Sequence, residues 1–208
     1  LWKDRVFWYF PVMSRLEQFF VDGVFFRQSP VSTDEGWTLL FIHGLGESGL
    51  SFERLIEGSE FFGSAPCLVP DLKGYGRSLW PMSPMSLEEV AEDLAFWLDQ
   101  RGEDDVVVIG HSMGGVIGTM LAERAPDLIS AFINVDGNMT IWDCTFSGKA
   151  AERTLNEFID DGFDLLRNDV YEGGLKDEAL RGYYAGLRLA HPETFYRHSC
   201  ELVDLSNR

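Results

Sequence analysis

Basic side chains are scarce in this sequence of 208 residues. Lys and Arg number 17 against 34 Asp and Glu, which gives a formal net charge of −17 at pH 7. A chain this acidic repels nucleic acid, anionic membrane surfaces and other polyanions. We therefore expect no nucleic-acid partner, and a neutral or apolar small molecule is the ligand class that fits better.

Long apolar runs are absent as well. No stretch of the sequence approaches the roughly 18 apolar residues of a membrane-spanning helix. The N-terminal stretch "LWKDRVFWYF" lacks the basic start, apolar core and small-residue cleavage site of a secretory signal. These absences predict a cytoplasmic protein with no membrane span.

Cysteine is rare. The three cysteines, Cys67, Cys144 and Cys200, show neither metal-ligand nor redox spacing. We expect them to be reduced and mostly buried thiols. No metal site and no organic cofactor is implied.

Apolar residues make up 45% of the chain, enough for one sizeable core. Two short apolar runs flank Asp22-Gly23, a dipeptide typical of a hairpin turn. Further apolar runs predict strands at residues 37–44, 65–71, 106–110 and 131–136. Helical patterns separate these runs. Such alternation indicates an α/β fold whose mostly parallel, doubly wound sheet is covered on both faces.

Helical patterns are bounded by capping and stop residues. Ser86 and Glu89 have the spacing of a capping box, and Gly102 ends the helix that they begin. After Cys144 the helix signals continue without a strand. The helical segments there are residues 149–161, 175–190 and 192–206, the last with Pro192 at a plausible first helical position.

A serine lies where one apolar strand meets a helical pattern. The pentapeptide "GHSMG", Gly110 to Gly114, matches the G-x-S-x-G nucleophile elbow, in which a sharp turn lifts the serine hydroxyl above the sheet edge. Glycines lie two residues before and two residues after the serine, because the strained turn leaves no room there for side chains. The strand before it and the helix after it favour Ser112 as a nucleophile over a merely structural glycine turn.

A second loop, "FIHGLGES", follows another apolar strand. Acyl transfer needs two backbone N–H groups aimed at the developing oxyanion, one after the nucleophile and one from such an earlier loop. Those groups would belong to Met113 and Leu45, with Gly44 close to the substrate. A phosphate-binding loop is the alternative, but the loop has no trailing Lys-Ser/Thr and no G-x-G-x-x-G.

Together, "HGLGES", "DLKGYGRS" and "GHSMGG" make the chain resemble proteins of the α/β-hydrolase fold over nearly its whole length. The second motif departs slightly, with Lys73 where the family more often has Arg. The resemblance implies a core of residues 1–144 and a helical cap of residues 145–208. Trp142, just before the cap, and Phe146 within it are tentative substrate-binding residues, although most aromatic residues at helical spacing are core.

The resemblance also implies an acid and a histidine. In most members the acid follows the strand after the cap and the histidine comes later still, and neither segment exists here. A subset carries the acid at the end of the strand after the elbow helix, where this chain has Asp136. Asp136 would then orient the imidazole. An Asp held in a turn at a strand end is the alternative.

The four histidines are His43, His111, His191 and His198. None is a credible general base: His43 belongs to the oxyanion loop, His111 points away from Ser112, and the other two lie in the cap pattern. The strand before Asp136 would also be left as an uncovered sheet edge. We therefore expect the C-terminal strands and the histidine segment to lie beyond Arg208. Three explanations for the missing segment stay open: it was removed from this chain, it belongs to a second chain, or it never existed because the protein is a decayed relative of the family.

These features predict a serine hydrolase that cleaves an ester, lactone or similar acyl bond of a small, largely uncharged substrate through an acyl-enzyme. We expect the isolated chain to be inactive. A serine at position 112 argues against the related epoxide hydrolases and haloalkane dehalogenases, which use a carboxylate. Carbon–carbon bond hydrolases, haloperoxidases and acyltransferases stay open, as does a non-catalytic ligand-binding protein on the same fold.

Overall fold

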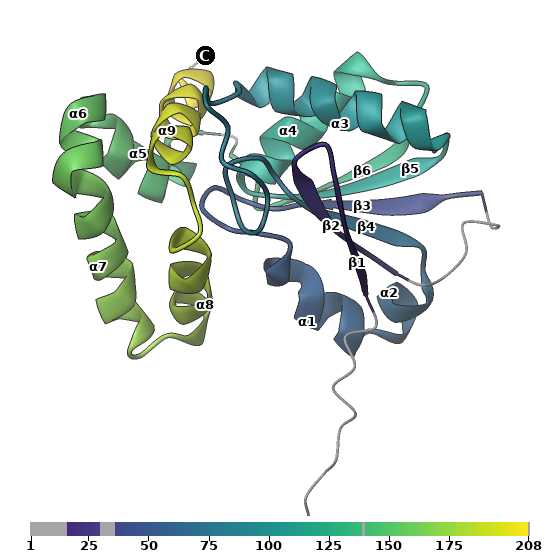
Figure 1. Cartoon of the computed structure of the whole chain (residues 1–208), viewed down its shortest axis with the longest axis horizontal. Helices are drawn as coiled ribbons and strands as arrows, with labels where there is room; N and C mark the ends of the chain where they lie inside the picture. The colour runs from purple at the N-terminus through teal and green to yellow at the C-terminus, as the bar shows by residue number, and fades with distance from the viewer. Residues whose placement is uncertain (1–15, 30–35, 139, 208) are drawn as a thin grey trace, which may run out of the picture.

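The computed structural model describes residues 16–29, 36–138 and 140–207, and these contain a six-stranded sheet of order β1-β2-β4-β3-β5-β6 (Figure 1). The hairpin β1–β2 and the pair β2–β4 are antiparallel, whereas β4, β3, β5 and β6 run parallel. The predicted α/β fold with a mostly parallel sheet is confirmed. The strands are β1 (Glu17–Val21), β2 (Val24–Gln28), β3 (Thr38–Ile42), β4 (Cys67–Asp71), β5 (Val106–His111) and β6 (Ile129–Val135).

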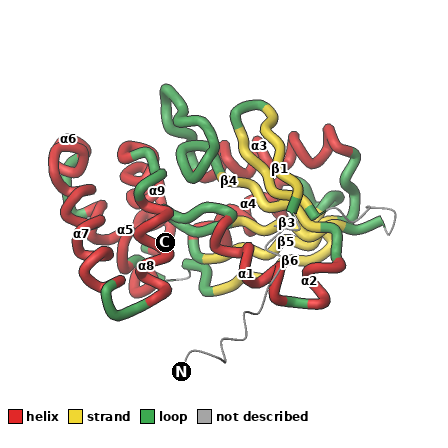
Figure 2. Tube along the Cα trace, turned by 60° about the horizontal axis from the view of Figure 1, so that its bottom comes forward, coloured by secondary structure: helices red, strands yellow, loops and turns green. Residues whose placement is uncertain are grey.

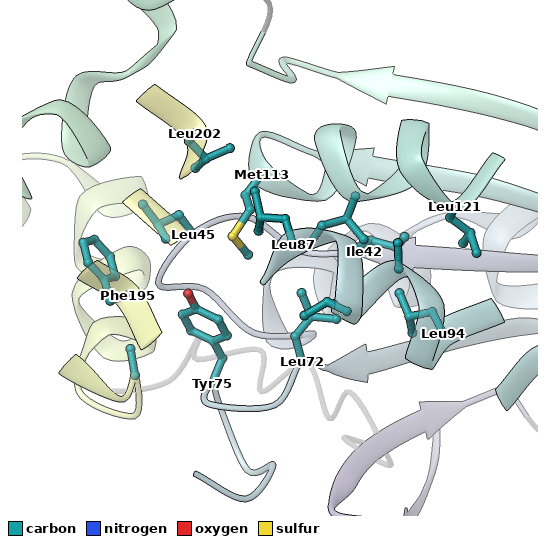
Figure 3. Close-up of a cluster of buried hydrophobic side chains, with 14 of the residues drawn as sticks. Ile42, Leu45, Leu72, Tyr75, Leu87, Leu94, Met113, Leu121, Phe195 and Leu202 are labelled. Carbon is teal, nitrogen blue, oxygen red and sulfur yellow. The ribbon is translucent and has the colours of Figure 1, made fainter. Parts of the chain in front are cut away.

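Helices cover both faces of the sheet centre. Alternate side chains of β3 point to opposite faces, since the side-chain period of a strand is two. Leu39 and Phe41 join a buried cluster with Phe52, whereas Leu40 and Ile42 join the larger cluster of Figure 3. Figure 1 shows α1 (Leu50–Gly58) and α2 (Glu60–Ser64) below the sheet, and α3 (Leu87–Arg101) and α4 (Met113–Arg124) above it.

The local signals at turns and helix ends are confirmed. Asp22 and Gly23 both have positive φ, 49° and 83°, as the two-residue hairpin turn requires. The Ser86 side chain accepts from the Glu89 N–H and Glu89 accepts in return from the Ser86 N–H, which forms the predicted capping box of α3. The same helix ends at Gly102 in the left-handed region, with φ 72°.

The last strand, β6, differs from the expected two-sided cover. Ile133 and Val135 on it are 50% and 42% exposed, whereas Phe132, which precedes them and points to the opposite face, is partly buried and packs against the main core. One face of β6 thus packs on the core, and in the described part of the chain no helix buries the other. The strand is the sheet's edge, as predicted.

Helices beyond Cys144 gather beside the sheet rather than on it (Figure 2). A single helix over residues 149–161 is wrong: α5 stops at Ala151, and Thr154 caps a new helix through reciprocal hydrogen bonds with Glu157. A π-helical turn, Phe158–Gly162, leads into α7. The helices are α5 (Thr145–Ala151), α6 (Leu155–Glu157), α7 (Phe163–Gly174), α8 (Glu178–Leu187) and α9 (Pro192–Ser206).

These helices touch the loops that follow β3 and β4. Phe195 of α9 lies in the same buried cluster as Leu45, and Figure 3 shows both near Met113. Tyr75 is completely buried, and its hydroxyl donates to Nδ1 of His198 over 2.8 Å, while Nε2 of His198 donates to the Met85 carbonyl over 2.8 Å. The helical layer is therefore held by a neutral, fully bonded histidine. The proposed division at residue 144 stays a prediction, and residues 1–15 of its first part lie outside the described residues.

We expect His198 to make stability depend on pH. Burial lowers its pKa from 6.5 to about 4, so the unfolded chain takes up the proton first as pH falls. The stability that comes from burying the neutral imidazole is fully present above pH 6.5 and is lost as the pH falls toward 4. Between pH 7 and pH 5, this one group should lower the free energy of unfolding by about 2 kcal/mol. Urea unfolding at both pH values should show a smaller difference for His198→Gln. Equal differences in the two proteins would contradict the assignment.

Candidate active site

The elbow serine has a strained backbone. Ser112 stands between β5 and α4 with φ 52° and ψ −120°, a region that side-chain-bearing residues rarely adopt. Its N–H donates to the Val135 carbonyl over 3.0 Å, and its carbonyl accepts from the Gly115 N–H over 2.7 Å. Strand β6 and the first turn of α4 therefore hold the strained turn in place.

The glycines around Ser112 are required by contact. A Cβ atom at Gly110 would overlap the Gly114 carbonyl oxygen, and one at Gly115 would overlap Oδ1 of Asn134. No rotation of a side chain relieves the first overlap because both partners are backbone. The sequence pattern of the elbow thus has a direct steric cause.

The loop after β3 meets the elbow. A Cβ atom at Gly44 would lie 3.2 Å from the Ser112 Cβ, so the two segments approach closely only because residue 44 is glycine. Leu45 and Met113 are buried, with only 6% and 0% of the whole residue exposed. Within residues 16–29, 36–138 and 140–207, neither of their N–H groups has a hydrogen-bond partner. The structure thus leaves free the two N–H groups that the sequence predicts for the oxyanion.

The Ser112 hydroxyl donates a weak hydrogen bond to Oδ1 of Asn138 over 3.4 Å. The amide of Asn138 is itself oriented by donation from Nδ2 to the Asp143 carbonyl over 3.2 Å. Nothing in the sequence pointed to Asn138, because no motif covers the turn that follows β6. It is a polar group that faces the nucleophile from a third segment.

Asp136 lies directly after β6, where Val135 is paired with His111. It is exposed, and its φ of 51° is that of a turn residue. The charge of Asp136 acts on His111. The pKa of His111 is raised mainly by a hydrogen bond to Glu47 and further by the charge of Asp136. Asp136 is thus close to the elbow but no imidazole joins it to Ser112 in the described residues, and its role as acid stays a prediction.

The remaining histidines are engaged elsewhere. Nε2 of His43 accepts from the Leu72 N–H over 2.9 Å and its Nδ1 donates to the Gly44 carbonyl over 2.8 Å, while burial lowers its pKa. His191 caps α9, accepting from Thr194, and packs against Trp80. These roles agree with the expectation that neither is the general base.

The two tentative aromatic residues have different surroundings. Phe146 packs against Tyr183 of α8 with ring centroids 4.8 Å apart, whereas Trp142 is 89% exposed. A cleft of about 850 Å³ does open between α1 and α8. Neither aromatic residue nor Ser112 is among its lining residues, which include Glu47, Glu53, Arg54, Glu178 and Arg181.

Metal-ligand clusters and membrane-spanning helices are both missing from the part of the chain that the structure describes. Its His, Cys, Asp and Glu side chains form no group of three or more able to hold a metal ion. No described helix is long and apolar enough to cross a membrane. Cys67 and Cys144 are buried, as the sequence predicts for most of its thiols.

Comparison with known proteins identifies the family of this chain. A family model described as "alpha/beta hydrolase fold" matches residues 38–196. Lipase LipV of Mycobacterium tuberculosis is 38% identical over 98 residues, which make up 47% of this chain and 36% of LipV. The matched region is therefore only about a third of the length of this curated relative.

Solved structures with the same arrangement include two acyl hydrolases. An esterase from Thermogutta terrifontis matches with a TM-score of 0.68 and 20% identity, over 87% of this chain and 67% of that chain. The N-acyl homoserine lactonase AidH matches with a TM-score of 0.65 and 18% identity, over 91% of this chain and 69% of that chain. At such identities these matches establish the fold alone.

Proposed function

The chain belongs to the alpha/beta hydrolase fold family, and from this premise we propose that it is a serine hydrolase of the carboxylic-ester type. Its substrate would be an ester, lactone or similar acyl compound that is small and largely uncharged. The observation that carries the proposal is the strained Ser112, with φ 52°, beside the free N–H groups of Leu45 and Met113. Strain of this kind is typical of functional sites.

The chemistry follows from these groups. Oγ of Ser112 attacks the carbonyl carbon while its proton passes to a base, and the carbonyl oxygen becomes an oxyanion that accepts from the Leu45 and Met113 N–H groups. The intermediate then expels the alcohol, which takes up the proton, and leaves an acyl-enzyme. Water, deprotonated by the same base, releases the acid and restores Ser112.

The base in this proposal is a histidine outside these 208 residues, because the histidines described above are engaged in other contacts. Asp136 is the candidate for the acid that orients that histidine. We further propose residues 145–208 as a cap that bounds the substrate site, with Phe146 and Trp142 as substrate contacts. A cytoplasmic location is part of the same proposal.

A fluorophosphonate probe tests this function, since it reacts covalently with an activated serine. We expect the full-length gene product to be labelled at Ser112, as located by peptide mass spectrometry, and Ser112→Ala to remain unlabelled. The isolated 208-residue chain should be labelled slowly or not at all, and added imidazole should accelerate its labelling by supplying a base. A folded full-length protein that takes no label would overturn the proposal and favour the non-catalytic alternative.

A further inference from the structure

One carboxylate lies between the two segments that carry the oxyanion donors. Oε2 of Glu47 accepts from the Gly44 N–H over 2.9 Å and lies 3.0 Å from Nδ1 of His111. The Glu47 side chain is 16% exposed and that of His111 is 33% exposed, so the pair is largely shielded from water. The motif "HGLGES" contains Glu47, but its partner in the elbow motif is visible only in three dimensions.

The first of these contacts closes the loop on itself. The Glu47 N–H donates to the Gly44 carbonyl over 3.2 Å, while the Glu47 carboxylate accepts from the Gly44 N–H in return. Gly46, with φ 74°, occupies the turn position that requires a positive φ. The result is that the Gly44 N–H is occupied and the Leu45 N–H is the donor left free.

The second contact joins the loop to the elbow. His111 directly precedes Ser112, and a Cβ atom at Gly44 would lie 3.1 Å from Nδ1 of His111. The Glu47–His111 contact is therefore made at a place where the two segments approach closely. Since Leu45 belongs to one segment and Met113 to the other, this contact bears on the distance between the two free N–H groups.

Electrostatics strengthens the contact. Burial acts to raise the pKa of Glu47, but the hydrogen bond and charge of His111 and the Gly44 N–H outweigh it and lower that pKa. The same hydrogen bond raises the pKa of His111, against its partial burial and with help from Asp136. Both shifts favour the carboxylate–imidazolium form, in which a bond of this kind is stronger than between neutral groups.

We propose that Glu47 is the positioning residue of the oxyanion hole, and that its bonds to the Gly44 N–H and to His111 hold the Leu45 N–H at a fixed place relative to the Met113 N–H. The inference rests on the proposed function, because it assigns the hole to acyl transfer. Glu47 touches neither the reacting carbonyl nor Ser112 in this role. It acts through the loop backbone and through His111.

The test compares Glu47→Ala and Glu47→Gln with wild type in the full-length gene product. Labelling rates are measured over a range of fluorophosphonate concentrations. They give the maximal labelling rate and, separately, the probe concentration at which half of that rate is reached. We expect Glu47→Ala to lower the maximal rate about 10- to 100-fold, because misplaced donors lose oxyanion stabilisation, with little change in half-saturation. Glu47→Gln keeps an acceptor for the Gly44 N–H, so its loss should be smaller. Glu53→Ala, another cleft carboxylate, is the matched control and should behave as wild type.

NMR titration of the His111 side chain provides a second measurement that does not depend on the labelling reaction. The pKa of His111 should fall in both Glu47 variants and stay unchanged in Glu53→Ala. A lowered His111 pKa with an unchanged maximal labelling rate would overturn the proposal, as would a change in half-saturation alone. If the wild-type protein takes no label, the proposed function fails and the role of Glu47 fails with it. If the wild-type protein is labelled but the Glu47 variants are labelled at the same maximal rate, only the role of Glu47 fails. Circular dichroism checks that each variant is folded, and Glu47→Gln carries the test where Glu47→Ala does not fold.

Discussion

Replacing Gly114 by alanine should lower both the stability of the protein and the labelling of Ser112. A Cβ atom there would overlap the carbonyl oxygen of Ile42 and lie 2.7 Å from its carbonyl carbon. It would also lie 2.9 Å from the carbonyl oxygen of His43. All three atoms are backbone of β3 or of the residue after it, so no side chain can rotate away. Helix α4 must move off the sheet centre, and overpacking of this kind costs about 1–3 kcal/mol or more.

Labelling should fall with stability in this variant, because α4 begins with Met113 and the β3 end leads into Leu45. A displacement between these segments changes the distance between the two free N–H groups. Urea unfolding gives the free energy of unfolding, and probe labelling under native conditions gives the site. We expect labelling to fall at least about tenfold even where the variant is fully folded.

Gly148→Ala is the matched control. A Cβ atom at Gly148 would have only the Cys144 Cβ nearby, at 4.0 Å, and the residue lies inside helix α5. Alanine is the better helix former there, so this variant should be as stable as wild type or more stable by up to about 1 kcal/mol. Equal stability of Gly114→Ala and Gly148→Ala would contradict the steric account.

The sheet and the elbow could be predicted because their causes are local in the sequence. Apolar runs such as Thr38–Ile42 become buried strands, and Ser86 with Glu89 forms its capping box from residues three apart. The elbow is recognisable from the spacing of its pentapeptide, within which Gly110 contacts Gly114, although Gly114 also contacts Ile42 and His43 of a distant segment. Each of these patterns consists of residues close together in the sequence, so the sequence alone suffices to predict it.

The features that escaped prediction depend on residues far apart in the chain. Glu47 meets His111 across 64 positions and Ser112 meets Asn138 across 26. Neither pairing leaves a spacing that a motif could capture. The exposed Ile133 on β6 is also a tertiary effect, because the sequence shows an apolar strand but not which of its faces receives a helix.

The break between α5 and α6 was missed for a different reason. Residues 149–161 keep a helical pattern, and the local signal against one helix is Thr154 with Glu157 three residues later. That pair is a second capping box inside the segment, of the same kind that located the start of α3. The start of α6 was therefore available from the sequence, whereas the π-helical turn after it was not.

Removing Arg27 should give one of the largest losses of stability in the core. Nη1 of Arg27 lies 2.6 Å from Oδ1 of Asp71, with the two side chains 1% and 0% exposed. The same carboxylate accepts from the Gly49 N–H at 2.7 Å and the Arg77 N–H at 2.8 Å, so it joins β2 and β4 to the start of α1 and to the loop after β4. Without Arg27, Asp71 becomes a buried anion that has lost its cation, which costs about 3–5 kcal/mol.

Urea unfolding of Arg27→Ala measures that loss, and Arg54→Ala is its control. Arg54 pairs with Glu178 at 2.7 Å, but the two side chains are 88% and 72% exposed, so water and salt screen the pair and its removal should cost far less than the loss of Arg27. Similar losses in the two variants would contradict the role of burial. The double variant Arg27→Met/Asp71→Asn should recover only part of the loss. It removes the unpaired charge, but the amide side chain that replaces the carboxylate can accept from one backbone N–H while presenting a donor to the other.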